Sequence, residues 1–436
     1  MDDRQKMDAA VIGGGLGGLA AAAYLARGGR SVVLYEKASA LGGRAMTTTA
    51  GEFRFNLGPH ALYAASHGIA VLRELGVAFH GAKPGASGGF ALDAGRKHAL
   101  PGGFLSLLTT GLFGLPAKLE TARLLAGFGR IDPVPLTHMP VSEWLEANVR
   151  HPGVRRLVAG LVRLTTYSDD PQRLSAATAI AQVQSALRSS VLYIDGGWQT
   201  LVEGLRAAAR ALGVRIVTGA RAAAVEREAG TWRVRLADGK ACEAPAVVVA
   251  ADPDTVAELL SGSAQATARR WAAAAIPVKA ACLDLALSKL PQPRATFALG
   301  IDRPLYLSVH SAVATLGPHG TAVIHVAKYL GNAASDPKAD EKELERLMDL
   351  VQPGWRDLVV QRRFLPDMLV SNALPTAAMG GNAGRPGPAV PDADGVYVVG
   401  DWVGPDGLLA DATLASAKRA ANMILQRNAR PALAAA

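Results

Sequence analysis

The feature that most constrains this chain is a glycine-rich turn near its N-terminus, between a short apolar strand and a helix. Residues 9–12 read as a buried strand, residues 17–27 have a helical composition, and residues 31–35 read as a second buried strand. The turn reads GGGLGG, and Gly13, Gly15 and Gly18 fit the pattern G-x-G-x-x-G. Strand, glycine turn, helix and strand in this order predict a Rossmann-type βαβ unit that binds a dinucleotide.

Each glycine of the turn has its own physical task. Gly13 permits the tight turn, Gly15 lets the backbone approach a pyrophosphate, and Gly18 lets the helix pack closely on the strand. The backbone amides at the helix start face the negative phosphates, which adds Leu16 and Gly17 to the predicted cofactor contacts. The turn is therefore predicted to hold a pyrophosphate through its backbone.

The end of the second strand supplies a carboxylate. Glu36 stands there and is followed by Lys37. A carboxylate at this position of a Rossmann unit can accept hydrogen bonds from a ribose diol. We therefore expect these two residues to lie beside the ribose of the cofactor.

Composition and charge narrow the class of protein. The chain has 436 residues, of which 50% are apolar and 19% charged, so we expect a globular protein of two or three domains. Its formal net charge is +9, but the basic residues are mostly arginines scattered along predicted helices, which argues against nucleic-acid binding. The two cysteines, Cys242 and Cys282, form neither a metal-binding spacing nor a disulfide framework. We therefore expect no metal and a reducing, cytoplasmic compartment.

A long apolar stretch, residues 102–129, points to lipid. Its first part carries no charge, but Pro116, Lys118, Glu120 and Arg123 then interrupt it. Such a segment cannot easily span a bilayer, but it could lie on one or wall a lipophilic channel. Together with the basic net charge, it predicts peripheral contact with the inner face of a membrane rather than a span.

After the second strand the chain reads YEKASALGGRA. An acidic residue followed by Gly-Gly-Arg resembles the flavin-dependent amine oxidases, phytoene desaturases and protoporphyrinogen oxidases. This resemblance implies FAD as the cofactor, with Gly43 and Arg44 near its pyrophosphate or flavin. The chemistry agrees, since an arginine beside two glycines can donate to a phosphate while the backbone closes in.

The segment GVYVVGDWVGPDGLLADATLASAKRAA near the C-terminus resembles the second flavin-contacting segment of the same superfamily. Its Gly-Asp-Trp form is most similar to the hydroxysqualene dehydroxylase and carotenoid desaturase branch. The resemblance implies that Gly400 and Asp401 meet the ribityl or phosphate side, although Asp401 would also suit a helix cap or a turn. It implies further that Gly407, Leu408 and Leu409 approach the flavin, where a helix N-terminus stabilises negative charge.

Two other segments extend the resemblance. Residues 194–253 resemble the returning half of the FAD domain in the desaturase branch, which implies that Val225 lies on the adenine side. The loop FNLGPHALY resembles the stretch that passes the flavin face, which implies that Gly58 and Pro59 lie beside the cofactor.

Three side chains are candidates for the chemistry. His60 and Tyr63 lie in the flavin-face loop, and a histidine titrates near neutrality and can move a proton. A histidine that only bonds to backbone, or positions the flavin without chemistry, is the alternative. Lys279 resembles the lysine of amine oxidases that holds a water against flavin N5, and desaturases generally lack this lysine. The alternative is a lysine at a strand edge in solvent. Tyr167 and Trp402 are further candidates for the pocket wall, although such aromatics more often lie in a core.

We therefore predict an α/β fold in two parts. A discontinuous Rossmann-type FAD-binding domain takes residues 1–58, 193–262 and 391–436. An α+β substrate domain takes residues 59–192, which read as mainly helical, and residues 263–390. The active site is expected between the two domains.

The resemblance implies an FAD-dependent oxidoreductase that removes hydride or hydrogen from a lipophilic organic substrate, with oxygen or a quinone as electron acceptor. A flavin amine oxidase is an alternative that Lys279 would favour. A redox-neutral isomerase and a flavoprotein without turnover also stay open.

Overall fold

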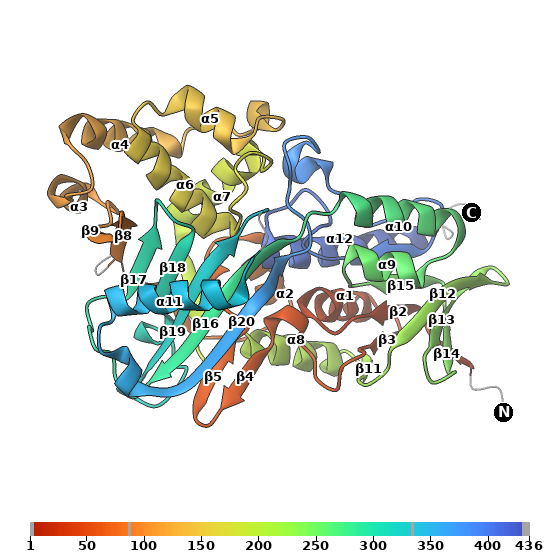
Figure 1. Ribbon diagram of the computed structural model, residues 1–436. Helices are drawn as coiled ribbons and strands as arrows, with labels where there is room; N and C mark the ends of the chain where they lie inside the picture. The colour runs from red at the N-terminus through yellow and green to blue at the C-terminus, as the bar shows by residue number, and fades with distance from the viewer. Residues whose placement is uncertain (1–3, 86–88, 333–334, 430–436) are drawn as a thin grey trace.

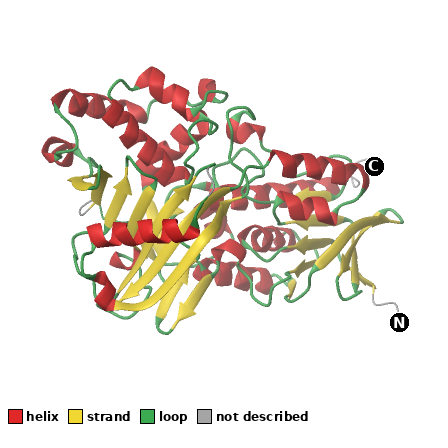
Figure 2. Cartoon of the chain, viewed as in Figure 1, coloured by secondary structure: helices red, strands yellow, loops and turns green. Residues whose placement is uncertain are grey.

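Two large sheets at opposite sides of the molecule organise the fold (Figure 1). The computed structural model describes residues 4–85, 89–332 and 335–429. Helices flank both sheets, so the described part of the chain has the mixed α/β architecture that the sequence predicts (Figure 2).

The first sheet has five parallel strands and carries the glycine turn. In spatial order its strands are β11 (Arg215–Val217), β3 (Val32–Tyr35), β2 (Ala9–Ile12), β15 (Ala246–Val249) and β21 (Val396–Val398). Apart from the edge strand β11, these are continuous runs of buried residues, as expected for a parallel sheet that is covered on both faces. The strands come from the beginning, the middle and the end of the chain.

Side-chain alternation divides the residues of the first sheet between two apolar cores. One face is covered by the helices α1 (Leu16–Arg27), α8 (Gln199–Ala211) and α12 (Leu409–Ala429). The other face is covered by α9 (Pro253–Leu259), α10 (Gly262–Ala274) and a smaller four-stranded sheet. In spatial order that smaller sheet consists of β1 (Arg4–Lys6), β14 (Ala241–Ala244), β13 (Thr231–Leu236) and β12 (Ala222–Glu228).

The second sheet has seven strands and is mainly antiparallel. In spatial order its strands are β20 (Val359–Ser371), β16 (Val278–Leu287), β19 (Ala322–Leu330), β18 (Leu305–Val309), β17 (Phe297–Gly300), β8 (Gly89–Asp93) and β9 (Arg96–Ala99). Helix α11 (Pro337–Val351) covers one face and shares a core with Leu283 and Leu285 of β16. Cys282 and Ala286 of the same strand belong to other cores, and Ala286 packs against the hairpin of β4 (Thr47–Ala50) and β5 (Phe53–Asn56). The even-numbered residues of β16 therefore face the part of the molecule that carries the cofactor motifs.

A group of helices lies beyond one end of the second sheet (Figure 1). They are α3 (Phe104–Thr109), α4 (Leu115–Phe128), α5 (Val141–Asn148), α6 (Pro152–Thr166) and α7 (Ala176–Ser189). Helix α2 (His67–Glu74) and a small sheet of β6 (Leu62–Tyr63), β10 (Val191–Ile194) and β7 (Gly81–Ala82) complete this part of the chain. The prediction of a mainly helical segment missed β8 and β9, because these short strands lack a clear apolar alternation.

The apolar stretch that the sequence singled out forms α3 and α4. Four leucines on it are exposed: Leu105, Leu108, Leu115 and Leu119, with exposed fractions of 75%, 52%, 69% and 53%. Among the described residues, no helix combines the length and the apolar character that a membrane crossing requires.

Candidate active site

The glycine turn is held by contacts that only glycine tolerates. Gly13 has a φ of +104°, a conformation that residues with a side chain rarely adopt. A Cβ atom on Gly18 would lie 1.9 Å from the carbonyl oxygen of Gly13. Helix α1 therefore starts directly against β2, as the close packing of a Rossmann helix requires.

At Gly15, in contrast, there is room for a side chain. A Cβ atom there would meet the carbonyl oxygen of Gly42 at 3.7 Å, and one on Gly43 would meet the Cα atom of Gly15 at 3.9 Å. A bridge between Gly15 and Gly42 brings the two loops together, and no side chain of the described residues caps the start of α1. A phosphate fits this cradle, because free backbone amides and the helix dipole both favour an anion.

Glu36 accepts hydrogen bonds from the glycine turn and from the loop that follows β3. Its Oε2 accepts the N–H of Gly14 at 2.6 Å, and its Oε1 accepts the N–H of Ala38 at 2.8 Å. A carboxylate has lone pairs beyond the two that these bonds use, so a ribose hydroxyl can still donate to Glu36. Lys37 is exposed beside it. Contacts of the two residues with a ribose stay predictions.

Asp401, from the C-terminal motif, is fully engaged by protein donors. Arg44 Nη1 donates to its Oδ2 at 2.8 Å and to the carbonyl oxygen of Val370 at 2.7 Å. Asn372 donates its Nδ2 to Asp401 Oδ1 at 2.8 Å and its backbone N–H to Oδ2 at 3.1 Å. Burial raises the pKa of the Asp401 carboxyl, but Arg44 and Asn372 outweigh it, so the net shift is downward. The group joins three segments of the chain, whereas direct contact of Asp401 with the cofactor stays a prediction.

The loop before α12 is strained and clamped. Leu409, the first residue of α12, has a φ of +54°, which is uncommon for a residue with a side chain. Arg385, which is 6% exposed, donates to the carbonyl oxygens of Asp401 and Gly407, both at 2.7 Å. Burial lowers the pKa of Arg385 to about 10. Sequence reasoning missed this arginine because it lies outside every motif. The flavin contacts of Gly400, Gly407, Leu408 and Leu409 stay predictions.

His60 is pinned between two carbonyl oxygens. Its Nδ1 lies 3.1 Å from the oxygen of Gly58, and its Nε2 lies 3.0 Å from the oxygen of Arg44. Burial lowers the pKa of His60 to about 4, so the ring is neutral at pH 7 and donates a hydrogen bond to only one of the two oxygens. Its ring edge meets Trp198, with centroids 4.8 Å apart. These contacts favour a positioning role for His60 over proton transfer.

The second sheet reaches the flavin-face loop at Gly58. A Cβ atom on Gly58 would lie 2.6 Å from the Sδ atom of Met368 and 3.5 Å from the Sγ atom of Cys282. Tyr167 donates its hydroxyl to the carbonyl oxygen of Pro59 at 3.0 Å, from a backbone with a φ of +60°. Strained residues of this kind cluster at functional sites. The flavin-face loop therefore packs against β16, β20 and the end of α6.

Tyr63 lies behind this loop. It is buried, and its hydroxyl donates to the carbonyl oxygen of Thr165 at 3.1 Å. Burial raises the pKa of the Tyr63 phenol above its usual value. Because the hydroxyl is used by α6, its part in the chemistry stays a prediction.

Lys279 lies apart from these residues. Its Nζ atom pairs with the carboxylate of Asp367 at 2.8 Å, and the two side chains are 40% and 59% exposed. Strand alternation puts Lys279 on the opposite face of β16 from Cys282, which meets Gly58. The geometry therefore gives no support to a water held by Lys279, and kinetics must test that role.

Two other predicted residues lie in an apolar core. Val225 is fully buried in β12, and its proposed adenine contact stays a prediction. Trp402 is 2% exposed, donates its Nε1 to the carbonyl oxygen of Ala251 at 2.9 Å and rests against Trp271. Trp402 is thus a core residue and not part of the pocket wall.

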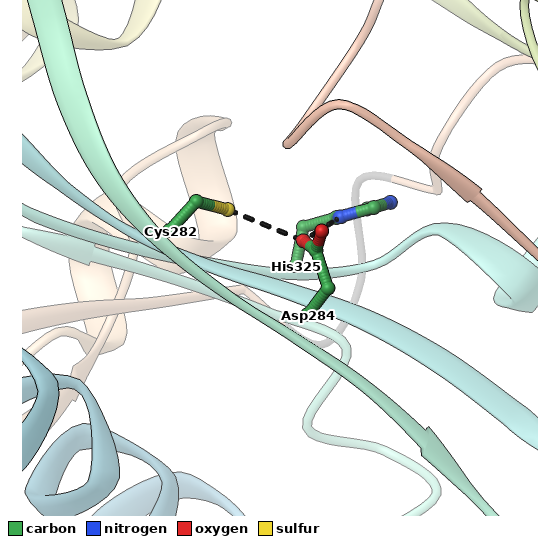
Figure 3. A group of neighbouring side chains, drawn as sticks. All are labelled: Cys282, Asp284 and His325. Atoms are coloured by element: carbon green, nitrogen blue, oxygen red, sulfur yellow. Dashed lines mark hydrogen bonds and ion pairs between the residues drawn. The ribbon is translucent and has the colours of Figure 1, made fainter. Parts of the chain in front are cut away.

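A polar row crosses the second sheet next to Cys282 (Figure 3). His325 of β19, Asp284 of β16 and Arg363 of β20 are partners in register on adjacent strands. His325 Nδ1 lies 2.5 Å from Asp284 Oδ1, and Arg363 Nε donates to Asp284 Oδ2 at 3.1 Å. Arg363 also donates to the backbone oxygen of Asn56, at the end of β5. The row therefore connects the second sheet to the strand that leads to Gly58.

This group also has the residue types of a metal site. Cys282, Asp284 and His325 offer ligand atoms within 4.8 Å of one another. However, the guanidinium of Arg363 already pairs with Asp284, and burial raises the pKa of the Cys282 thiol well above its usual value. A cation would have to displace the guanidinium and the thiol proton. We therefore interpret the group as a hydrogen-bonded row.

Comparison with known proteins identifies the family. Residues 16–425 match the family described as "Flavin containing amine oxidoreductase". The chain therefore belongs to this family. Carotenoid 3,4-desaturase from Haloarcula japonica is 51% identical over 59 residues, which are 14% of this chain and 12% of the desaturase. Because the match covers so little of the desaturase, the similarity holds for the matched segment only.

Solved structures agree on the fold. An oxidoreductase from Methanosarcina mazei superposes with a TM-score of 0.74 and 19% identity, covering 97% of this chain and 100% of that protein. Putrescine oxidase bound to putrescine superposes with a TM-score of 0.72 and 16% identity, with coverages of 97% and 100%.

Family membership and the phosphate cradle lead to one class of protein. The chain is an FAD-dependent oxidoreductase of the flavin-containing amine oxidoreductase family. The predicted family, fold class and cofactor are thus confirmed, whereas the assigned domain boundaries and individual site residues stay predictions.

Proposed function

We propose that this protein dehydrogenates a lipophilic organic substrate, in the manner of a desaturase, and passes the electrons to oxygen or a quinone. The observation that carries the proposal is the buried apolar cluster beside Gly58. It is a cluster of aromatic and apolar side chains: Cys282, Tyr306, Ala327 and Tyr329, with Leu164, Tyr167, Phe297, Leu365 and Met368 packed against them. An apolar substrate bound against these side chains would be stabilised by burial of its apolar surface. The same side chains would exclude water from the reacting atoms.

The charges around this cluster support the same substrate class. Asp284 is paired with Arg363 and Asp401 is paired with Arg44, so neither of these buried carboxylates is free to balance a substrate ammonium. An apolar chain needs no such partner. The desaturase named above acts on a carotenoid by its name, which is also an apolar substrate.

In this proposal some residues of the chain bind the cofactor and others position it. Gly15 and the amides of α1 would hold the pyrophosphate, and Glu36 the ribose. The strained start of α12 at Leu409 would place a helix N-terminus at the flavin. Bound FAD supplies the acceptor for the two electrons that leave the substrate. His60 would fix the flavin-face loop to the segment of Arg44.

Anaerobic bleaching of the bound flavin tests this function. The purified protein is mixed without oxygen with lycopene in detergent micelles, with geraniol and with benzylamine, and loss of the oxidised flavin absorbance is followed. We expect the polyene or the isoprenoid alcohol to bleach the flavin and the amine to leave it oxidised. Bleaching by the amine alone would establish the amine-oxidase alternative. A flavin that only dithionite reduces would support an isomerase or a flavoprotein without turnover.

We also propose that α3 and α4 rest on the membrane from which such a substrate would enter. The exposed leucines Leu105 and Leu115 support this, because an exposed apolar patch marks an interaction surface. In liposome flotation with anionic vesicles at low salt, the protein should float, and the variant with Leu105→Glu and Leu115→Glu should not. The control is Leu187→Glu on α7, a leucine that is 55% exposed elsewhere. A wild-type protein that does not float would contradict membrane contact.

A further inference from the structure

The polar row of the second sheet places a histidine beside a fully buried carboxylate. We propose that His325 accepts the proton that the substrate loses when it is oxidised, with Asp284 and Arg363 as positioning residues. This inference rests on the proposed function, because it requires the substrate to lie on the face of the sheet that meets Gly58.

The tautomer of His325 follows from its partner. Asp284 is fully buried, and its ionised carboxylate can only accept hydrogen bonds. His325 Nδ1, 2.5 Å from Asp284 Oδ1, must therefore carry a proton. In the neutral imidazole this leaves a lone pair on Nε2, which lies on the side of the ring away from Asp284 (Figure 3). This is the arrangement of a histidine base that a carboxylate orients.

The lone pair of His325 has no partner within the described chain. Nε2 is buried and unpaired there, and the whole residue is 0% exposed. A buried acceptor without a donor destabilises a fold, so such an atom calls for an occupant that brings a hydrogen. A substrate C–H or O–H group on the Gly58 side would be that occupant.

The groups around His325 can hold the added proton. Burial raises the pKa of Asp284, but His325 and Arg363 outweigh this and keep the carboxyl ionised. Burial lowers the pKa of His310, whose ring centroid lies 4.4 Å from that of His325, and of His60, so neither adds positive charge. The imidazolium formed at His325 would therefore face one carboxylate at bonding distance.

Two more neighbours complete the surroundings. Burial keeps the thiol of Cys282, which donates to Asp284 at 3.2 Å, in its protonated form. Tyr193 stacks on His310 with ring centroids 3.8 Å apart and shares a hydrogen bond of 2.9 Å with Ser308, the register partner of His325 on β18. Burial raises the pKa of the Tyr193 phenol, so it too is neutral.

The step balances with the cofactor already assigned. The substrate loses one hydrogen with both bonding electrons to FAD and a second hydrogen, as a proton, to His325 Nε2. A double bond forms between the two atoms that lost hydrogen, and His325 becomes an imidazolium. That proton returns to solvent before the next turnover.

The first experiment needs no substrate. We measure the midpoint potential of the bound flavin against pH near neutrality, for wild type, His325→Gln and the control His138→Gln, a histidine that bonds to Ala377 far from the row. If His325 takes up a proton whenever the flavin is reduced, reduction should consume two protons in wild type and in the control, one at the flavin and one at His325. The slope should then be about 59 mV per pH unit, and about 30 mV in His325→Gln, since one proton per two electrons gives 29.6 mV per pH unit. Equal slopes in all three proteins would overturn the proposal.

The second experiment reads the tautomer directly, and its first measurement uses wild type alone. Nitrogen-15 NMR of the labelled histidines in wild type should show His325 protonated at Nδ1 and unprotonated at Nε2 at pH 7. A proton on Nε2 at pH 7 would overturn the proposal. In Asp284→Asn the fixed tautomer should be lost, whereas a merely structural aspartate would leave it unchanged. If the protein binds no FAD, the proposed function is wrong. The tautomer measured by NMR would still test the proposed state of His325 independently.

Discussion

The first sheet and the second sheet are both built from buried strands, but they place their chemistry differently. In the first, β2, β3 and β15 carry no charged side chain, and the cofactor motifs lie in the loops that follow them. In the second, Asp284 and His325 stand inside the strands and meet across them. A parallel sheet can thus bind a ligand with backbone at its carboxyl edge, whereas this mainly antiparallel sheet offers side chains from its face.

The difference separates two kinds of substitution. Around the first sheet, an added Cβ atom changes how closely two backbones or a phosphate can approach. In the second sheet, a changed side chain alters charge, protonation and the apolar cluster beside Gly58. The predictions below compare these two regions, from the largest expected effect to the smallest.

The largest effect is expected at Gly18. Its Cβ atom would lie 1.9 Å from the backbone oxygen of Gly13, and neither backbone can give way. Gly18→Ala should lower the free energy of unfolding by about 4 kcal/mol or more, measured by denaturant titration. Gly102→Ala is the control, since an added Cβ atom there meets nothing within 4 Å. A Gly18→Ala protein as stable as wild type would contradict the close packing of α1 on β2.

The next effect is expected at Glu36. Glu36→Ala removes the acceptor at the end of β3, and each hydrogen bond to a charged acceptor contributes about 1.5–3 kcal/mol. The affinity of the apoprotein for FAD should therefore fall by about 10-fold to 100-fold, measured by quenching of FAD fluorescence on reconstitution. Glu52→Ala, an exposed glutamate, is the control. Unchanged affinity in Glu36→Ala would mean that the ribose lies elsewhere.

A smaller effect, counted per pH unit, is expected from the pH dependence of stability. Burial holds the pKa of folded His60 at about 4, below its unfolded value of about 6.5, so between these pH values the unfolded chain binds the extra proton. The contribution of neutral His60 to the free energy of unfolding is fully present above pH 6.5. It is lost as pH falls toward 4, by up to about 1.4 kcal/mol per pH unit. In His60→Gln, urea titrations over this range should give a slope shallower by about one proton. Parallel curves would show that His60 is not buried as a neutral ring.

The smallest effect is expected at Lys279. Its pair with Asp367 is exposed, and such pairs contribute about 0–1 kcal/mol. Lys279→Met should therefore leave stability and flavin reoxidation by oxygen nearly unchanged, measured by stopped-flow after reduction with dithionite. If the lysine held a water at flavin N5, reoxidation would slow by about 10-fold or more, equivalent to about 1.4 kcal/mol of barrier. That outcome would restore the amine-oxidase alternative.

Much of the first sheet could be predicted because its signals are local. The glycine turn with its flanking strands is contiguous, and the structure places α1 at Leu16–Arg27, against a predicted helix of residues 17–27. In the second sheet, β16 is likewise an almost continuous buried run, which is a local signal. Helix α11 also has a local start signal, because Asp336 caps it and Pro337 fits its first turn.

The chemistry of the second sheet could not be predicted in the same way. Asp284, His325 and Arg363 come from three strands far apart in the sequence, and each reads alone as one polar residue in a strand. Only the register of the sheet brings them together. Arg385 and Asn372 were missed because they lie outside every motif, in irregular segments that only the fold brings to Asp401 and its loop.

Bound flavin in the Gly15→Ala variant tests most directly whether FAD lies on the glycine turn. The added Cβ atom would meet no protein atom closer than 3.7 Å, so the fold should keep its stability. A pyrophosphate approaching the backbone at this point would clash with it. We predict that the variant unfolds like wild type but binds FAD at least about 10-fold more weakly, a loss of about 1.4 kcal/mol. A variant with wild-type stability and full FAD occupancy would contradict the placement of the cofactor.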